Sequence, residues 1–241
     1  MKPIRLLSGF LTVGLWTLLS RLLGFARDIV IAARLGDGPV AEAFLVAFAL
    51  PNMFRRFFAE GAFNMAFVPM FSKRLERGED AHAFARDAFA GLGSVLIVFT
   101  LLAQLAMPWL VLAMASGFAE DGRFDMAVGF GRIVFPYILF ISLAALLSGV
   151  LNATGRFVAA AAAPVLLNII LVTAMLGAPY MGWDFGMALA WAVPVAGVAQ
   201  LALVWWAAAR AGFPLIRSGP RSSSALLASL RPLRWRAAWC R

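Results

Sequence analysis

Hydrophobic residues occur along this chain in long runs, without the alternation of half-buried strands or the polar face of soluble helices. A helix needs about 20 apolar residues to cross a bilayer, and four windows meet that length: residues 88–115, 133–151, 158–178 and 186–209. Each contains a proline, which a membrane helix tolerates when neighbouring groups satisfy the freed carbonyl, and which predicts a kink. The runs are too long for the strands of a membrane barrel. The sequence therefore predicts an all-α integral membrane protein.

The N-terminal part contains two more stretches of spanning length, 6–35 and 41–71, and charged residues interrupt both. Between them, Gly36-Asp37-Gly38-Pro39 has the composition of a tight turn. We expect two helices joined by a hairpin, about six transmembrane helices in all, with the second helix bent or discontinuous between Pro51 and Gly61. A secretory signal peptide is the alternative for the first run, but further apolar sequence rather than a polar domain follows it.

Composition and charge indicate the environment in which the chain folds. Hydrophobic residues make up 63% of the chain and charged residues only 14%, whereas soluble domains are about a quarter charged. The net charge of +9 leaves open nucleic acid, an anionic membrane surface or an anionic substrate. Nearly all loop cations lie on one side of the predicted membrane: Lys2, Arg5, Lys73, Arg74, Arg77, Arg86, Arg156 and those of residues 210–241. The positive-inside rule then predicts a multi-pass protein with both termini in the cytoplasm, and with membrane lipids rather than nucleic acid around it.

Several charged residues fall inside the two interrupted stretches: Arg21, Arg27, Asp28, Glu42, Arg55, Arg56 and Glu60. An arginine at a helix centre costs about 2.5 kcal/mol or more, so these side chains must pair, reach an interface or face a cavity. Arg21 and Asp28 are seven residues apart and share a face, whereas Arg27 projects about 120° from Arg21. One polar stripe is predicted from residues that recur every four positions: Asn52, Arg56, Glu60 and Asn64.

Two interpretations of these charges remain open. The pairs Arg27–Asp28 and Arg56–Glu60 are either ion pairs that only fix the packing, or groups that bind a ligand. Arg21 and Arg55 have no obvious local carboxylate, which favours a substrate or ion path. Because a guanidinium donates bidentate hydrogen bonds to phosphate, we predict an anionic, phosphorylated ligand.

The sequence offers little for catalysis. It has no H-E-x-x-H, Walker or G-x-S-x-G motif, and it contains a single His82 and a single Cys240. We therefore predict that the chain is not an enzyme and has no cofactor and no metal site. A membrane-embedded transferase is the alternative, but the helices lack paired catalytic carboxylates.

Six runs carry a likeness to a known family: SRLLGFARD at 20–28, AFLVAF at 43–48, LPNMFRR at 50–56, FAEGAF at 58–63, FPYIL at 135–139 and APVLLNI at 163–169. In order and spacing they resemble the MurJ (MviN) family of bacterial lipid II flippases. The resemblance extends from about Leu6 to Arg210, and residues from Arg217 on do not resemble the family.

The resemblance implies an inner-membrane transporter of the MOP exporter superfamily, with two lobes around a cationic cavity. It would move lipid II, the lipid-linked peptidoglycan precursor, by alternating access, in cell wall biogenesis and the maintenance of cell shape. Cell-wall synthesis proteins are then candidate partners. By position, the resemblance assigns substrate binding to Arg21, Arg27 and Arg55, supported by Asp28, Glu42, Asn52, Arg56 and Glu60. Glu42 stands where an aspartate is expected.

The length of the chain corresponds to the N-terminal lobe alone. We expect residues 1–209 to form a six-helix transmembrane lobe, and residues 210–241 to be a basic cytoplasmic tail at a truncated or frameshifted end. Half a transporter cannot enclose a two-sided cavity, so we expect the chain to be inactive alone. The alternatives are an exporter of another polyprenyl-linked saccharide and a non-functional membrane fragment.

Overall fold

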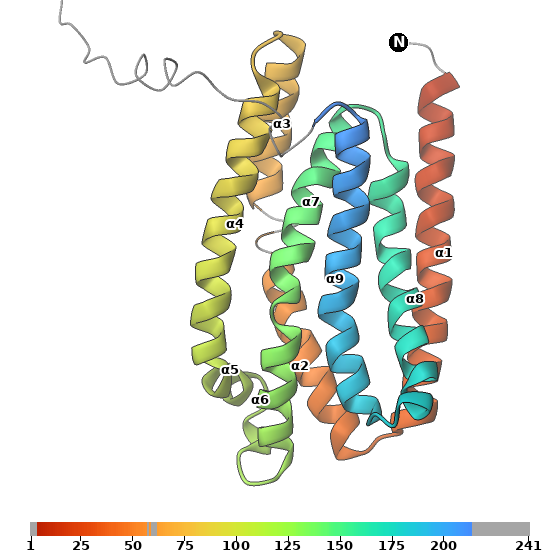
Figure 1. Ribbon diagram of the computed structural model, residues 1–241, viewed down its shortest axis with the longest axis vertical. Helices are drawn as coiled ribbons and strands as arrows, with labels where there is room; N and C mark the ends of the chain where they lie inside the picture. The colour runs from red at the N-terminus through yellow and green to blue at the C-terminus, as the bar shows by residue number, and fades with distance from the viewer. Residues whose placement is uncertain (1–3, 57, 59–61, 214–241) are drawn as a thin grey trace, which may run out of the picture.

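The computed structural model describes residues 4–56, 58 and 62–213. Within them the chain is a bundle of helices (Figure 1), which are α1 (Ile4–Leu35), α2 (Pro39–Arg55), α3 (Ala62–Glu76), α4 (Ala81–Leu105), α5 (Met107–Met114), the short 3-10 helix η2 (Ser116–Phe118), α6 (Arg123–Val134), α7 (Tyr137–Ala153), α8 (Val158–Met181) and α9 (Phe185–Arg210). The long helices lie roughly along one common axis, with α1 at one edge and α4 at the other (Figure 1).

The predicted all-helical membrane architecture is confirmed. Four helical segments of the described part are long and apolar enough to cross a membrane: Ala81–Leu105, Arg123–Ala153, Val158–Met181 and Phe185–Arg210. They contain or overlap the four apolar windows of the sequence. The total of about six spans stays a prediction, because α1 and the α2–α3 stretch are not among these four.

The predicted hairpin between the first two helices is present. Helix α1 ends at Leu35, and Gly36 has a φ of 65°, the left-handed geometry that glycine adopts without steric cost. Helix α2 begins at Pro39, whose fixed φ suits the first position of a helix and whose missing N–H leaves no donor unsatisfied there. Local turn chemistry thus sets the antiparallel course of α1 and α2.

The second stretch is not one regular α-helix, because Arg56 and Phe58 have π-helical geometry. Helix α2 ends at Arg55 and α3 begins at Ala62. In Figure 1, α2 occupies one half of the bundle's length and α3 the other. Glu60 lies outside the described residues and the Asn64 side chain is not described, so the polar stripe from Asn52 to Asn64 stays a prediction.

Two of the apolar windows consist of two helices each. The chain leaves α4 at Ala106, just before Pro108 in the first turn of α5, because proline cannot donate to a preceding carbonyl. A second interruption falls at Phe135 and Pro136, between α6 and α7. Phe135 and Pro136 keep right-handed helical backbone angles, so the interruption at Pro136 is a kink, as predicted, within one helical segment.

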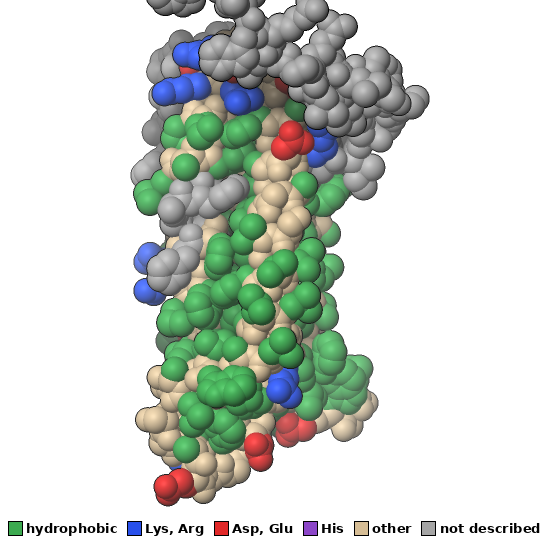
Figure 2. Space-filling model, turned by 90° about the vertical axis from the view of Figure 1, so that its left-hand side faces the viewer, with side chains coloured by type: hydrophobic (Ala, Val, Ile, Leu, Met, Phe, Trp, Pro, Cys, Tyr) green, Lys and Arg blue, Asp and Glu red, His purple; other side chains and the backbone are tan. Residues whose placement is uncertain are grey.

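Opposite ends of the bundle carry different charges. Basic residues occupy the last turns of α3 and α9, and Arg156 donates from Nη1 to the carbonyl of Arg210 at 3.1 Å. Acidic residues cap or begin helices at the other end, as Asp184 does for α9 and Asp125 for α6. Figure 2 shows hydrophobic side chains along most of the visible face, with most charged ones towards the ends. This pattern agrees with a protein whose middle section lies in lipid.

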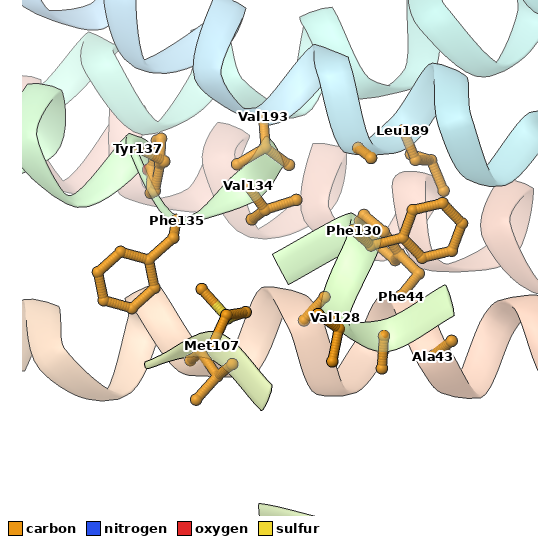
Figure 3. Close-up of a cluster of buried hydrophobic side chains, with 14 of the residues drawn as sticks. Ala43, Phe44, Met107, Val128, Phe130, Val134, Phe135, Tyr137, Leu189 and Val193 are labelled. Carbon is orange, nitrogen blue, oxygen red and sulfur yellow. The ribbon is translucent and has the colours of Figure 1, made fainter. Parts of the chain in front are cut away.

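Buried apolar side chains form two clusters. The first lies mainly where α2, α5, α6, α7 and α9 meet (Figure 3), and its largest members are Phe44, Met107, Phe130, Phe135 and Tyr137. The second joins α3, α4, α7 and α9, and its members include Phe67, Phe71, Leu96, Leu147 and Val204. In lipid there is little hydrophobic drive between helices, so close packing at small residues has to hold them together.

Gly197 of α9 tests this packing. A Cβ there would lie 2.8 Å from Cδ2 of Tyr137 and 3.1 Å from Cβ of Phe140, both on α7. We expect Gly197→Ala to destabilise the bundle by about 1–3 kcal/mol and to lower the melting temperature of the detergent-solubilised protein, followed by tryptophan fluorescence. The matched control is Gly177→Ala on α8, where no heavy atom lies within 4 Å of the added Cβ. The packing argument is rejected if both variants melt alike.

Candidate functional site

Arg27 and Asp28 of α1 form a pair. The Nε and Nη2 groups of Arg27 donate to Oδ1 of Asp28 at 3.0 and 2.8 Å. The Arg27 side chain is 20% exposed and that of Asp28 is 64% exposed. The carboxylate thus neutralises one edge of the guanidinium while remaining accessible itself.

The third contact of Arg27 crosses to another helix. Its Nη1 donates to Oδ1 of Asn168 at 3.0 Å, and Asn168 lies in α8. Asn168 in turn donates from Nδ2 to the carbonyl of Ser20 at 3.0 Å. Arg27 is therefore held by a carboxylate on its own helix and by a buried amide on the neighbouring helix.

Arg21 lies on a different side of α1. Its side chain is exposed, whereas Arg27 faces α8. This difference agrees with the predicted angle of about 120° between the two residues. At a rise of about 1.5 Å per residue, Arg27 lies about 12 Å and Arg21 about 21 Å along α1 from Leu35. Both guanidinium groups therefore lie well inside the length of the helix.

Arg55 lines a cavity in the middle of the bundle. The cavity has a volume of about 470 Å³, and α7, α8 and α9 supply most of its wall. Its described lining residues besides Arg55 are Val68, Tyr137, Ile141, Ala144, Ala145, Ser148, Gly149, Asn152, Ala160, Ala163, Pro164, Leu167 and Gln200. The guanidinium thus borders a space whose other described walls are small, apolar or neutral.

Aromatic packing places Arg55 there. Its neighbours Phe54 and Phe58 each lie 5.1 Å, between ring centroids, from Phe99 of α4. Phe54 also contacts Phe135, at 5.9 Å, at the kink between α6 and α7. Edge-to-face and tilted aromatic pairs of this kind are directional, so they fix the end of α2, where Arg55 lies.

The remaining stripe residues do not form one site in the described part of the chain. Asn52 donates from Nδ2 to the carbonyl of Phe48 on its own helix, at 2.9 Å. Arg56 is exposed just beyond the end of α2. Glu60 lies outside the described residues, so the predicted Arg56–Glu60 pair is not tested here.

Glu42 lies apart from the arginines of α1 and α2. It occupies the first turn of α2, and its Oε2 accepts a hydrogen bond from Nη1 of Arg123 at the start of α6. Arg123 also donates to Asp121 and lies over the ring of Phe118, 4.5 Å from its centroid. The hydrogen bonds from Arg123 hold the pKa of Asp121 below its ordinary value. This cluster joins the α1–α2 hairpin to the loop before α6.

Two buried amides are functional candidates that the charge-based analysis missed. Asn168 is 5% exposed and Gln200 is 1% exposed. Gln200 accepts from Tyr137 Oη at 3.2 Å and donates to the carbonyl of Ala163 at 2.7 Å, so it links α7, α8 and α9 beside the cavity. Amides inside otherwise apolar helices were the signal that could have identified both residues.

The arrangement is suited to binding an anion. Arg27 and Arg55 present guanidinium groups at depth, and each can form bidentate hydrogen bonds with a phosphate. In the described residues there is no group of three or more His, Cys, Asp or Glu that could hold a metal ion. A helical membrane bundle with Arg55 beside a cavity defines a polytopic membrane protein that can accommodate an anionic ligand.

Comparison with known proteins identifies the family. A sequence model described as lipid II flippase MurJ matches residues 31–233. The chain is 46% identical over 223 residues to a probable lipid II flippase MurJ of Rhizobium tropici, and 48% identical over 223 residues to that of Rhizobium meliloti. It is 44% identical over 201 residues to lipid II flippase MurJ of Burkholderia cenocepacia. The chain belongs to the MurJ family.

The alignments cover most of this chain but a minor part of each relative. They include 90% of the chain for both Rhizobium proteins and 82% for the Burkholderia protein, but 42%, 42% and 39% of those relatives. A solved structure titled lipid II flippase MurJ, inward closed conformation, has the same fold with a TM-score of 0.68 at 23% identity. That match covers 80% of this chain and 40% of the other. The chain thus spans about two-fifths of the length of these relatives, and the family match runs past Arg217, where sequence analysis expected the likeness to end.

The contact between Glu42 and Arg123 gives a prediction. Because the two groups attract one another across helices, Glu42→Arg and Arg123→Glu should each lower the melting temperature of the solubilised protein. The combined exchange should restore part of the loss by reversing the pair. If the double variant loses as much melting temperature as the two single variants together, the Glu42–Arg123 pair contributes nothing to stability. The pKa of Asp121 is held below its ordinary value by the hydrogen bonds from Arg123, so the stability that this contact contributes should be present at neutral pH and be lost as the pH falls through the lowered pKa.

Proposed function

We propose that this chain binds the diphosphate of lipid II and supplies the N-terminal part of a flippase that moves this precursor across the bacterial inner membrane. Membership of the MurJ family supports the transport class, and relatives of the chain are described as lipid II flippases. Alternating access is the proposed mode of movement. Charge at the two ends of the bundle supports both termini being cytoplasmic.

The cavity beside Arg55 is the observation that carries the proposal. Binding pockets for small ligands measure about 300–1,000 Å³, and this cavity measures about 470 Å³. A space of this size holds a headgroup fragment such as a diphosphate with adjoining sugar, rather than a whole lipid-linked glycopeptide. A guanidinium at its wall would compensate the phosphate charge that the apolar surroundings cannot.

Arg27 and Arg21 extend the cationic surface along α1. The edge of Arg27 that meets Asp28 has the geometry that a phosphate oxygen could occupy instead. Because Asp28 is largely exposed, exchange of one anion for another requires no repacking. We assign Arg21, which is exposed, to an earlier or later contact along the path of the substrate.

The other candidates have supporting roles in this proposal. Arg56 follows the last residue of α2, and we propose that it supports the binding site from there. Asn52 stiffens the last turns of α2 through its bond to Phe48. Glu42 holds the hairpin in place through Arg123.

An experiment in a complete transporter tests the proposal. Residues 1–213 of this chain would replace the corresponding part of the Rhizobium meliloti relative, in cells depleted of their own lipid II flippase. We expect the chimera to restore growth. Arg55→Ala should reduce lipid II flipping by about tenfold or more, since one charge-assisted bidentate contact is lost. Arg55→Lys should recover only part of this, because an ammonium lacks the planar fork.

The matched control removes a guanidinium elsewhere. Arg77 follows α3 in an exposed loop, where its Nη1 lies 3.8 Å from Glu79, so Arg77→Ala should leave flipping unchanged. Membrane insertion of every variant is measured by immunoblotting of membrane fractions. Normal flipping by the inserted Arg55→Ala chimera would remove the proposed site. If the chimera instead transports another polyprenyl-linked saccharide in the same cells, the result would favour the alternative of an exporter for that saccharide.

A further inference from the structure

Asn168 is a polar side chain in an apolar place. Helix α8 is otherwise composed almost entirely of small and aliphatic residues, and the Asn168 side chain lies at the contact with α1. A buried amide without partners costs about 1–3 kcal/mol, so its retention there depends on what it contacts. The position is one turn beyond Pro164, which lines the cavity.

Both halves of the Asn168 amide are used across the helix contact. Oδ1 accepts from Arg27 and Nδ2 donates to the carbonyl of Ser20, each at 3.0 Å. The partners fix the orientation of the amide, because a guanidinium has no acceptor and a carbonyl has no donor. Gly24 lies between these two contacts on α1, and a Cβ there would meet Asn168 Nδ2 at 3.6 Å. The amide therefore lies directly against the bare backbone of α1.

The two partners of Arg27 differ in a way that separates their roles. Asp28 is charged, on the same helix and 64% exposed, so it can be replaced by another anion. Asn168 is neutral, on a different helix and 5% exposed, so it cannot be replaced without opening the α1–α8 contact. A neutral acceptor also leaves the positive charge of the guanidinium available, which a carboxylate at the same place would not.

We propose that Asn168 is a positioning residue that holds Arg27 through Nη1, so that the Nε and Nη2 edge can exchange Asp28 for a phosphate oxygen of the substrate. This inference rests on the proposed function for the identity of the substrate. It assigns a role to a residue of α8 that touches no substrate itself and acts through Arg27.

The first measurement needs no substrate. In the purified chain in detergent micelles, the Nη groups of Arg27 are followed by ¹⁵N NMR and assigned by their loss in Arg27→Lys. Asp28→Ala removes the bonds of Nε and Nη2, so in that background the bond to Asn168 should by itself slow rotation about Nε–Cζ and give separate Nη1 and Nη2 signals. In the same background Asn168→Leu should merge them, whereas Asn168→Asp should keep them separate because an acceptor remains. Separate signals in Asn168→Leu in this background would overturn the positioning role.

The second measurement uses fluorescent lipid II as the probe, with the same purified chain. Asn168→Leu should weaken binding by about tenfold, the equivalent of one hydrogen bond to a charged group. Asn168→Asp preserves the shape of the side chain, but it should weaken lipid II binding at least as much, because the added carboxylate neutralises Arg27. In the Arg27→Ala background neither change should weaken binding further. Equal losses in both backgrounds would show a role in packing only, and would overturn the inference.

A control on the same helix separates this effect from disturbance of α8. Thr173 bonds only the carbonyl of Ile169 within α8 among its described contacts, so Thr173→Val should change neither measurement. The NMR measurement and the binding measurement also distinguish this inference from the proposed function. If the unaltered chain fails to bind lipid II while the NMR signals behave as expected, the proposed substrate is wrong and the positioning of Arg27 stands.

Discussion

A guanidinium between apolar helices has to satisfy its N–H groups within the protein, because water is scarce there and an unsatisfied charged donor is costly. Arg27 meets this constraint with two side chains of unlike character, the carboxylate of Asp28 and the amide of Asn168. The same bonds determine how α1 lies on α8, since Asn168 also contacts the backbone of Ser20. The hydrogen bonds of Asn168 therefore both compensate the charge of Arg27 and hold α1 against α8.

The surroundings of Arg55 are different. The Phe54, Phe58 and Phe99 rings pack together near the end of α2, and Arg55 itself lines the cavity. Helix α2 ends at Arg55, so this residue lies at a helix terminus as well as beside the cavity. This part of the chain thus combines a cation, a helix end and open volume.

Local chemistry allowed much of the fold to be predicted, and long-range contacts account for what was missed. Apolar runs and turn residues such as Gly36 and Pro39 act over a few positions, so the membrane helices and the hairpin could be predicted. The stripe through Arg56 stays a prediction, because Glu60 lies outside the described residues. The Glu42–Arg123 contact joins residues 81 apart, and the Arg27–Asn168 contact joins residues 141 apart, so no local pattern indicates either. Helical angles did separate Arg21 from Arg27 correctly, because α1 is continuous.

In the proposed function, the neutral amide beside Arg27 follows from the need to bind and release an anionic ligand. A guanidinium fully neutralised by buried carboxylates would gain little by binding phosphate, and one without any partner would destabilise the helix that carries it. An amide that accepts one hydrogen bond orients the group at little electrostatic cost, and an exposed carboxylate that accepts the others can be exchanged. Arg27 has both kinds of partner. Binding and release of an anion then require only the exchange of one accessible partner, while the buried contact between α1 and α8 is kept.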